Sequence, residues 1–187
     1  MDTTPRQRIR HAAMELFGER GYRGPTLKAV AERADVSPGL VQHHFKTKQR
    51  LLSEVQAWVS QQLTDIGAGL LPGEANLGVD SARYDAFLVA NPVVAAYLRR
   101  RLLESTTTDD AEWFGGAVER RRERIAEARP DGQHLDVMAA MAVLIDVAPI
   151  LLGPLLEQAL DCDAAELATR WRQVETTLLG LPFDDAD

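Results

Sequence analysis

The spacing of apolar residues near the start of the chain permits little besides a bundle of short helices. The first helix carries the i, i+3, i+4, i+7, i+8 pattern of one buried face, at Ile9, Ala12, Ala13, Leu16 and Phe17. Gly21, Gly24 and Pro25 end it and form a turn. The pattern therefore predicts a helix that ends near residue 20 and packs through one face.

Two further short helices follow, each marked by an N-terminal capping residue. Thr26 predicts the start of a helix over 27–34, because its hydroxyl can accept a bond from a free backbone amide. Ser37-Pro38 predicts a third helix over 38–44, since proline presets φ at the first helical position. Three short helices joined by tight turns are typical of a helix-turn-helix.

The remainder of the chain also has a helical pattern. Thr47 caps a long fourth helix, and further helices are expected over about 81–90, 92–104, 109–129, 134–160 and 164–179. We therefore predict an all-α fold with two domains. Residues 1–50 form a three-helix N-terminal helix-turn-helix domain, and residues 51–187 form a larger helical domain.

The charge of the chain is divided unevenly between these two parts. The net charge is −7, yet residues 1–50 hold ten Lys and Arg against five Asp and Glu. The remaining residues hold the other 11 bases and 23 acids. This split indicates a basic head that faces nucleic acid, attached to an acidic body.

Fixed residues in the N-terminal segment point to a known family. They form the runs Ala12-Ala13-x-x-Leu16-Phe17-x-x-x-Gly21-Tyr22, Thr26-x-x-x-Val30-Ala31-x-x-Ala34-x-Val36-Ser37-x-Gly39 and His44-Phe45-x-x-Lys48-x-x-Leu51-Leu52. Residues 8–52 thus resemble the DNA-binding domain of TetR-type (tetracycline-repressor-like) transcriptional regulators. In such a domain the third helix enters the major groove of double-stranded DNA.

The expected DNA contacts lie on and around that third helix. Gln42 and His43 would read base edges, Leu40 a thymine methyl group, and Gly39 would allow close approach of the backbone. Lys48 lies in the first turn of the fourth helix, where free amides favour a phosphate, and the resemblance assigns phosphate contacts to Lys48 and His44. The full set is Thr26, Lys28, Ser37, Pro38, Gly39, Leu40, Gln42, His43, His44 and Lys48.

Alternatives stay open at several of these positions. Thr26 and Ser37 serve as caps whether or not DNA binds, and a residue such as Lys28, taken singly, is more often a solvated surface charge than a DNA contact. Most relatives carry tyrosine where this chain has Gln42, so the usual contact of that ring with the DNA backbone does not carry over.

The resemblance implies a small-molecule effector pocket in the larger domain. Candidate ligand residues are Trp58, Phe87, Tyr97, Trp113, Met138, Met141 and Asp146, although the aromatic and methionine residues suit an ordinary core equally well. Asp146 lies inside an apolar run, where it would meet a cationic ligand, an arginine such as Arg99, or solvent at the helix surface. The runs 99–101 and 120–122 are interpreted as solvated arginine faces.

The resemblance also implies a homodimer formed by the last two long helices. Candidate interface residues are Leu155, Trp171, Val174 and Leu178; the alternative is that each fills the core of its own chain. A dimer would place two third helices on DNA half-sites about 34–36 Å apart.

The sequence argues against other classes of protein. Cys162 is the single cysteine, so an internal disulfide and a thiolate zinc cluster are excluded. No catalytic set, metal site or cofactor motif appears, and the apolar run 138–156 is interrupted by Asp146, Pro149, Gly153 and Pro154, so no membrane span is expected. The prediction is a cytoplasmic, ligand-released repressor that binds a palindromic operator as a homodimer. The alternative is a constitutive DNA-binding dimer without a ligand.

Overall fold

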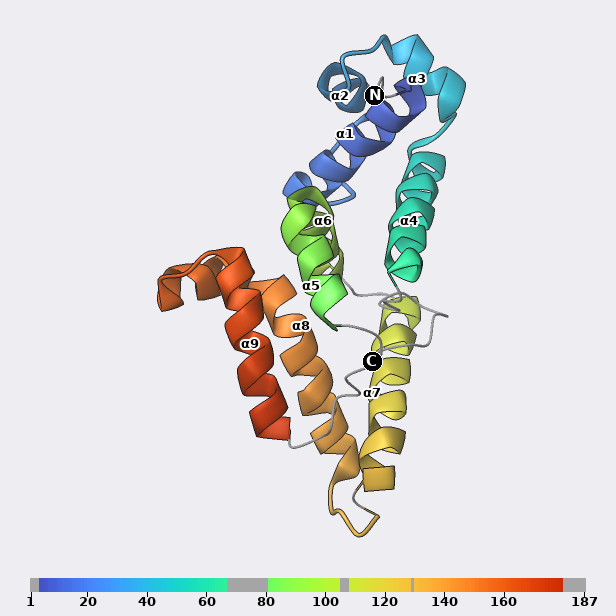
Figure 1. The fold of residues 1–187 in the computed structure, drawn as a ribbon. Helices are drawn as coiled ribbons and strands as arrows, with labels where there is room; N and C mark the ends of the chain where they lie inside the picture. Colours follow the sequence, from blue (N-terminus) through green and yellow to red (C-terminus); the bar gives the residue numbers. More distant parts are fainter. Residues whose placement is uncertain (1–3, 67–80, 105–107, 129, 180–187) are drawn as a thin grey trace. The chain divides into compact units, whose positions relative to one another are not determined.

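A computed structural model describes residues 4–66, 81–104, 108–128 and 130–179. All regular structure in these ranges is helical (Figure 1), as predicted. The helices are α1 (Pro5–Arg20), α2 (Leu27–Arg33), α3 (Pro38–His44), α4 (Lys48–Asp65), α5 (Ser81–Ala90), α6 (Pro92–Leu103), α7 (Thr108–Ala128), α8 (Leu135–Leu160) and α9 (Ala164–Leu179).

The predicted capping residues begin the predicted helices. The hydroxyls of Thr26, Ser37 and Thr47 accept from the amides of Ala29, Leu40 and Arg50 at 3.1, 3.2 and 3.2 Å. The carboxylate of Asp163 accepts from the Glu166 amide at 2.8 Å before α9. Each cap satisfies an amide that the helix itself leaves without an acceptor.

The chain divides into two compact units. The head unit comprises the described residues within Met1–Ile66 and Ala90–Glu104, and the body unit those within Gly67–Val89 and Ser105–Asp187. The head unit thus extends beyond the predicted helix-turn-helix domain by α4 and α6. The functional boundary at residue 50 stays a prediction, since a compact unit and a functional domain need not share their bounds.

In the head unit, α1 is the central element, in contact with α2, α3, α4 and α6. Its buried side chains are Ile9, Ala12, Ala13, Met14, Leu16 and Phe17. The other helices add buried side chains to this core, each 3% exposed or less. They are Val30 and Ala31 on α2, Val41 on α3, and Phe45 directly after α3. Val36, in the turn between α2 and α3, is only half-buried.

The contact between α1 and α6 depends on a glycine. A Cβ atom at Gly18 would lie 3.1 Å from the backbone nitrogen of Tyr97 and 3.2 Å from the carbonyl carbon of Ala96. The missing side chain therefore lets the two backbones approach closely. At the end of α6, Glu104 accepts from the Tyr22 amide at 3.4 Å, next to Gly21 with φ +71°.

In the body unit, α8 lies between α7 and α9 (Figure 1). Pro149 lies inside α8 and has no amide to donate to the carbonyl of Ile145, four residues earlier. The indole nitrogen of Trp171 on α9 donates to that carbonyl at 3.1 Å. The proline thus frees an acceptor that attaches α9 to α8.

The two faces of α8 differ in what covers them. One face is buried at Ala139, Ala142, Val143, Val147, Ile150 and Gly153. The opposite face exposes Val137, Met141, Leu144, Leu152 and Leu155. Within the described ranges α8 alone is long and apolar enough to cross a membrane by length and composition, a test that core helices also pass. Within its own chain, α8 is therefore buried on one face only.

The Trp171–Ile145 hydrogen bond yields a test by double-mutant cycle. Trp171→Phe leaves the Ile145 carbonyl without a donor and should lower the free energy of unfolding by about 1–3 kcal/mol. In a Pro149→Ala background the restored amide at position 149 donates to the Ile145 carbonyl. There Trp171→Phe should cost about 1 kcal/mol less than it does in the native background. Urea denaturation of the four proteins measures both values, and strictly additive losses would contradict the assignment.

Candidate nucleic-acid interface

Helix α3 is anchored by its apolar side and presents its polar side to solvent. Val41 and Phe45 are 0% and 3% exposed and pack in the head core, while Gln42, His43 and His44 are exposed. Because neighbouring helical residues diverge by about 100°, Val41 fixes the direction in which Gln42 and His43 project. The predicted base readers therefore share an accessible face.

The N-terminal end of α3 has room for a close partner. Pro38 and Gly39 are exposed and Leu40 is half-buried. A Cβ atom at Gly39 would meet nothing within 4 Å, so the protein itself does not require a glycine there. The open backbone matches the predicted close approach of a ligand at this end of the helix.

Lys48 is held in place by the turn that follows α1. Its Nζ donates to the Arg23 carbonyl at 3.1 Å and lies 4.6 Å from the centroid of the Tyr22 ring. Burial lowers the pKa of Lys48. Two donors of the ammonium group remain for an anion, and the capping oxygen of Thr47 takes only the Arg50 amide at this helix end. The start of α4 thus combines a fixed cation with free amides.

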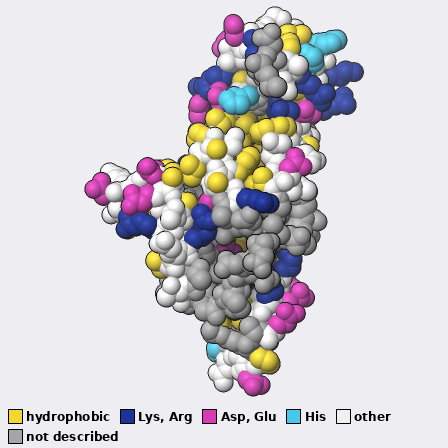
Figure 2. Space-filling view, in the orientation of Figure 1, with side chains coloured by type: hydrophobic (Ala, Val, Ile, Leu, Met, Phe, Trp, Pro, Cys, Tyr) yellow, Lys and Arg dark blue, Asp and Glu magenta, His cyan; other side chains and the backbone are white. Residues whose placement is uncertain are grey.

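Ion pairing leaves the positive charge concentrated near α3 and the start of α4. Arg6 pairs with Glu54 at 2.7 Å, and Arg33 pairs with Glu15 and Glu19 at 3.1 and 2.9 Å. Five other cations of residues 1–50 form no ion pair within the described part of the chain: Arg8 on α1, and Arg23, Lys46, Lys48 and Arg50. Figure 2 shows basic and histidine side chains at the surface of this end of the head unit.

The other predicted DNA contacts flank this surface. Thr26, Lys28 and Ser37 are exposed. Lys28 lies 4.0 Å from Glu32, with side chains 77% and 68% exposed, so this pair is solvated and weak. The hydroxyls of Thr26 and Ser37 act as caps but keep their O–H groups as donors for a phosphate.

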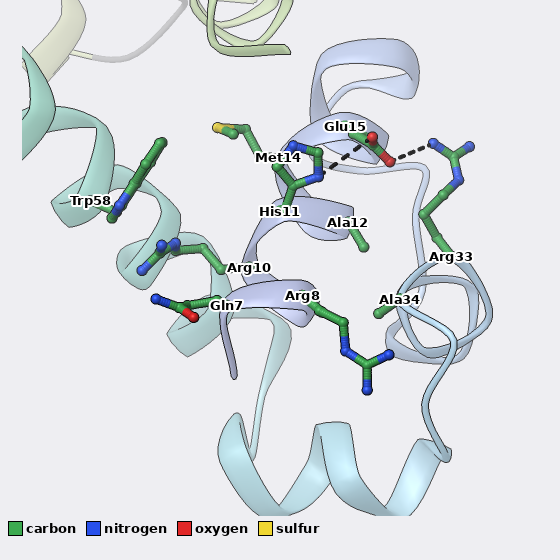
Figure 3. A pocket seen from close by; sticks show the side chains of 10 residues that line it. All are labelled: Gln7, Arg8, Arg10, His11, Ala12, Met14, Glu15, Arg33, Ala34 and Trp58. Carbon is green, nitrogen blue, oxygen red and sulfur yellow. Dashed lines mark hydrogen bonds and ion pairs between the residues drawn. The ribbon is translucent and has the colours of Figure 1, made fainter. Parts of the chain in front are cut away.

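A surface groove of about 470 Å³ also lies in the head unit. Figure 3 shows Arg10 and Trp58 on one side of α1 and Arg33 and Ala34 on the other. Trp58, a predicted ligand residue, stacks there against the Arg10 guanidinium, 4.6 Å from its ring centroid. The lining residues are Gln7, Arg8, Arg10, His11, Ala12, Met14, Glu15, Arg33, Ala34 and Trp58.

The structure does not gather the predicted effector residues in one place. Trp58 and Tyr97 belong to the head unit, while Phe87, Met138 and Asp146 belong to the body unit. Met141 is 58% exposed on the outer face of α8. The side chain of Trp113 lies outside the described part of the chain.

Asp146 has a partner that the sequence did not reveal. It pairs with Arg121, which is 4% exposed. The interpretation of 120–122 as a solvated face is therefore wrong for Arg121. A signal was available, because Arg121 lies four residues from both Ala117 and Ile125, two buried positions on the same face of α7.

Two of the predicted dimer residues are exposed. Leu155 is 64% and Val174 56% exposed, so both are accessible to a second chain. Trp171 is half-buried and bonded to α8 of its own chain. The side chain of Leu178 lies outside the described part.

Residues 9–55 match the family described as bacterial regulatory proteins, tetR family. The chain is 41% identical over 70 residues to the transcriptional regulatory protein RaaS of Mycobacterium tuberculosis, covering 37% of this chain and 32% of that protein. It is 40% identical over 74 residues to the transcriptional regulator YvkB of Bacillus subtilis, covering 40% and 38%. The matched segments thus span about a third of these relatives. The predicted family resemblance is confirmed.

Solved structures share the fold over nearly the whole chain. The Streptomyces coelicolor protein SCO4942 superimposes with a TM-score of 0.64 at 19% identity, covering 96% of this chain and 100% of that one. The SmeT–triclosan complex gives a TM-score of 0.57 at 19% identity, with 94% and 91% covered. At these identities the likeness concerns the fold alone, and it confirms the predicted all-α class.

The cap of α3 can be tested apart from any DNA contact. Ser37→Ala removes the acceptor for the Leu40 amide and should lower the free energy of unfolding by about 1 kcal/mol, while Ser37→Asn should restore most of it. Ser53→Ala is the control, since the Ser53 hydroxyl only donates to the Gln49 carbonyl inside α4. Urea denaturation checks all three, and an unchanged midpoint for Ser37→Ala would contradict the capping role.

Proposed function

We propose that this chain, whose residues 9–55 carry the DNA-binding domain of the bacterial tetR family, is a cytoplasmic transcriptional repressor. It binds a palindromic operator as a homodimer, and a small molecule bound in the body unit releases it. The observation that carries the proposal is the outward face of α3. There exposed polar side chains adjoin Arg23, Lys46, Lys48 and Arg50, none of which pairs with an acid within the described part of the chain.

The two groups of residues at this surface have different tasks. Lys48, Arg50 and Lys46 would neutralise phosphates, which positions the protein and makes affinity depend on salt. Gln42 and His43 would meet base edges, with Gln suited to bidentate pairing with adenine. Affinity therefore comes from the start of α4, and sequence choice comes from α3.

The outer face of α8 supports the homodimer. Its exposed apolar residues recur at spacings that place them along one side of the helix. They are Val137, Met141, Leu144, Leu152 and Leu155. From Val137 to Leu155 the stripe spans 19 residues, or 18 steps, which is roughly 27 Å at 1.5 Å per step. An apolar surface of this length in contact with water indicates a protein partner. A second copy is the partner that two DNA half-sites require.

The effector is the part that separates this proposal from its alternative, a constitutive DNA-binding dimer. A sensor requires a body unit that accommodates a ligand, whereas a constitutive dimer requires only a filled core. Buried donors without acceptors in the body unit favour a sensor.

Because phosphate contacts and base contacts have different roles, variants at the two groups of residues should have different effects on DNA binding. Lys48→Gln keeps a donor for the Arg23 carbonyl but removes the charge, so it should weaken binding to every duplex and lower the salt slope by about one. Gln42→Ala and His43→Ala should change the sequences selected from a random duplex library, with each lost base contact costing about 1–3 kcal/mol on the preferred site.

Arg20→Ala serves as the control for loss of one exposed charge elsewhere in the head unit, since Arg20 is 58% exposed at the end of α1. Fluorescence anisotropy over a salt series gives the slopes. Equal losses on all sequences from every variant would refute the assigned roles, and no salt-dependent binding by the native protein would refute DNA binding.

The dimer face predicts a change of oligomeric state. Leu155→Glu places a charge in the apolar stripe and should raise the dimer dissociation constant at least tenfold, because a desolvated carboxylate would lack a partner. Leu103→Glu is a matched control, since Leu103 on α6 is equally exposed at 64%. Sedimentation equilibrium measures the constants; a monomeric native protein, or equal effects of both changes, would rule out this interface.

A further inference from the structure

Polar and charged side chains from four helices of the body unit are linked by ion pairs or by the effect of one charge on another. We call them the arginine cluster: Tyr84 and Asp85 on α5, Arg120, Arg121 and Arg124 on α7, Asp146 on α8, and Arg172 on α9. Charged groups rarely leave water without a partner. A cluster of this kind therefore needs a reason beyond the filling of a core.

Two ion pairs form the frame of the cluster. Arg121 pairs with Asp146 between α7 and α8, with side chains 5% and 21% exposed. Arg172 pairs with Asp85 between α9 and α5 at 2.9 Å. The pairs lie near each other, because the charge of Asp146 adds to burial in raising the pKa of Asp85 to about 6, against the opposing effect of Arg172.

Three buried donors in the cluster have no acceptor within the described part of the chain. They are the Nε–H of Arg120, the Nε–H of Arg121 and the hydroxyl of Tyr84, a residue 9% exposed. A guanidinium group only donates hydrogen bonds, so what the cluster lacks is acceptors. A buried donor left unsatisfied costs about 1–3 kcal/mol. Three such donors together therefore indicate a site that receives its acceptors from a bound ligand.

The charge around these donors selects the kind of acceptor. Burial, and next the charge of Arg121, lower the pKa of Arg124; the charge of Asp146 opposes this, and Arg120 adds a smaller lowering. Arginine side chains of α7 thus repel one another in a partly desolvated place. An anion would relieve that repulsion, whereas a cation would add to it.

We infer that the arginine cluster binds a small organic anion. Its carboxylate accepts from the free Nε–H groups of Arg120 and Arg121 and from the hydroxyl of Tyr84. Arginine suits this task because its planar donors match the two oxygens of a carboxylate. The inference rests on the proposed function, since it gives the chemical class of the effector. A cationic ligand at Asp146 is one of three alternatives for that residue, and the inference excludes it, because Arg121 already neutralises the charge of Asp146.

The test compares ligands that differ only in charge. The native protein is heated with octanoate, octanamide or octylamine, and with phenylacetate, phenylacetamide or phenethylamine. At least one carboxylate should raise the Tm and bind in calorimetry, while its amide and amine counterparts bind at least tenfold more weakly. Failure of both carboxylates to bind, or equal binding by the amines, would overturn the inference.

Variants locate the site. Tyr84→Phe removes only an unsatisfied hydroxyl, so the unliganded protein should be as stable as the native one or more so, yet bind the carboxylate at least fivefold more weakly. Arg120→Gln should cost at least tenfold in affinity. Arg122→Gln on the same helix is the matched control, because Arg122 is exposed and pairs with Glu119.

A double variant addresses the buried pair itself. Arg121→Met with Asp146→Leu replaces the ion pair by apolar side chains, a change that proteins often tolerate, and it should abolish carboxylate binding in a folded protein. Retained affinity in this variant and in Arg120→Gln would show that the cluster is only structural, and would overturn the inference.

Binding to DNA is measured separately by anisotropy. Salt-dependent DNA binding without carboxylate binding would remove the anion site and leave the proposed DNA-binding function standing. Carboxylate binding without any DNA binding would refute the proposed DNA-binding function and leave the anion site standing.

Discussion

The burial of α1 is the constraint on which the head unit depends. Helices α2 and α3 have seven residues each, too few to be stable in water by themselves. They persist because α1 offers them a buried surface, with Ile9 and Ala13 fully covered and Leu16 and Phe17 each 2% exposed. Once Val41 is fixed against that surface, the outward direction of Gln42 and His43 follows from helical geometry. The face proposed to read DNA is thus a consequence of packing on the opposite side of α3.

Local signals in the sequence predicted most of the helix ends, because the physics of a helix end is local. Thr26, Ser37 and Thr47 act on amides three residues away, and no tertiary contact is needed to interpret them. Contacts between distant segments were harder to predict. Arg121 looked like part of a solvated run because its neighbours Arg120 and Arg122 are also arginines, and only the fold brings it to Asp146. The Trp171 bond to Ile145 depends on a carbonyl freed by Pro149, which the sequence reveals only once α8 is known to continue through the proline.

The α8 helix shows why hydrophobicity alone does not determine environment. A residue such as Val143 is buried in its own chain, whereas Leu144, one position further, is 51% exposed. The α8 helix is apolar enough to cross a membrane by composition. Two protein faces account for this composition, one covered by α7 and α9 and one that the proposed dimer would cover. Met141 illustrates the ambiguity: its residue type suits a ligand pocket, but its position places it on the outer stripe.

The path by which an anion in the body unit would act on the head unit is set by chain connectivity. α5 carries Tyr84 and Asp85 and ends at Ala90, and α6 begins at Pro92, so the single residue Asn91 joins the helix with the ligand donors to a helix of the head unit. Proline at the first position of α6 fixes its own φ and restricts the backbone of Asn91. Within the head unit, Gly18 lets α6 lie directly against the backbone of α1. In the proposed mechanism the signal of anion binding would pass along the chain from α5 to α6 and from there to α1, the helix on which α3 packs.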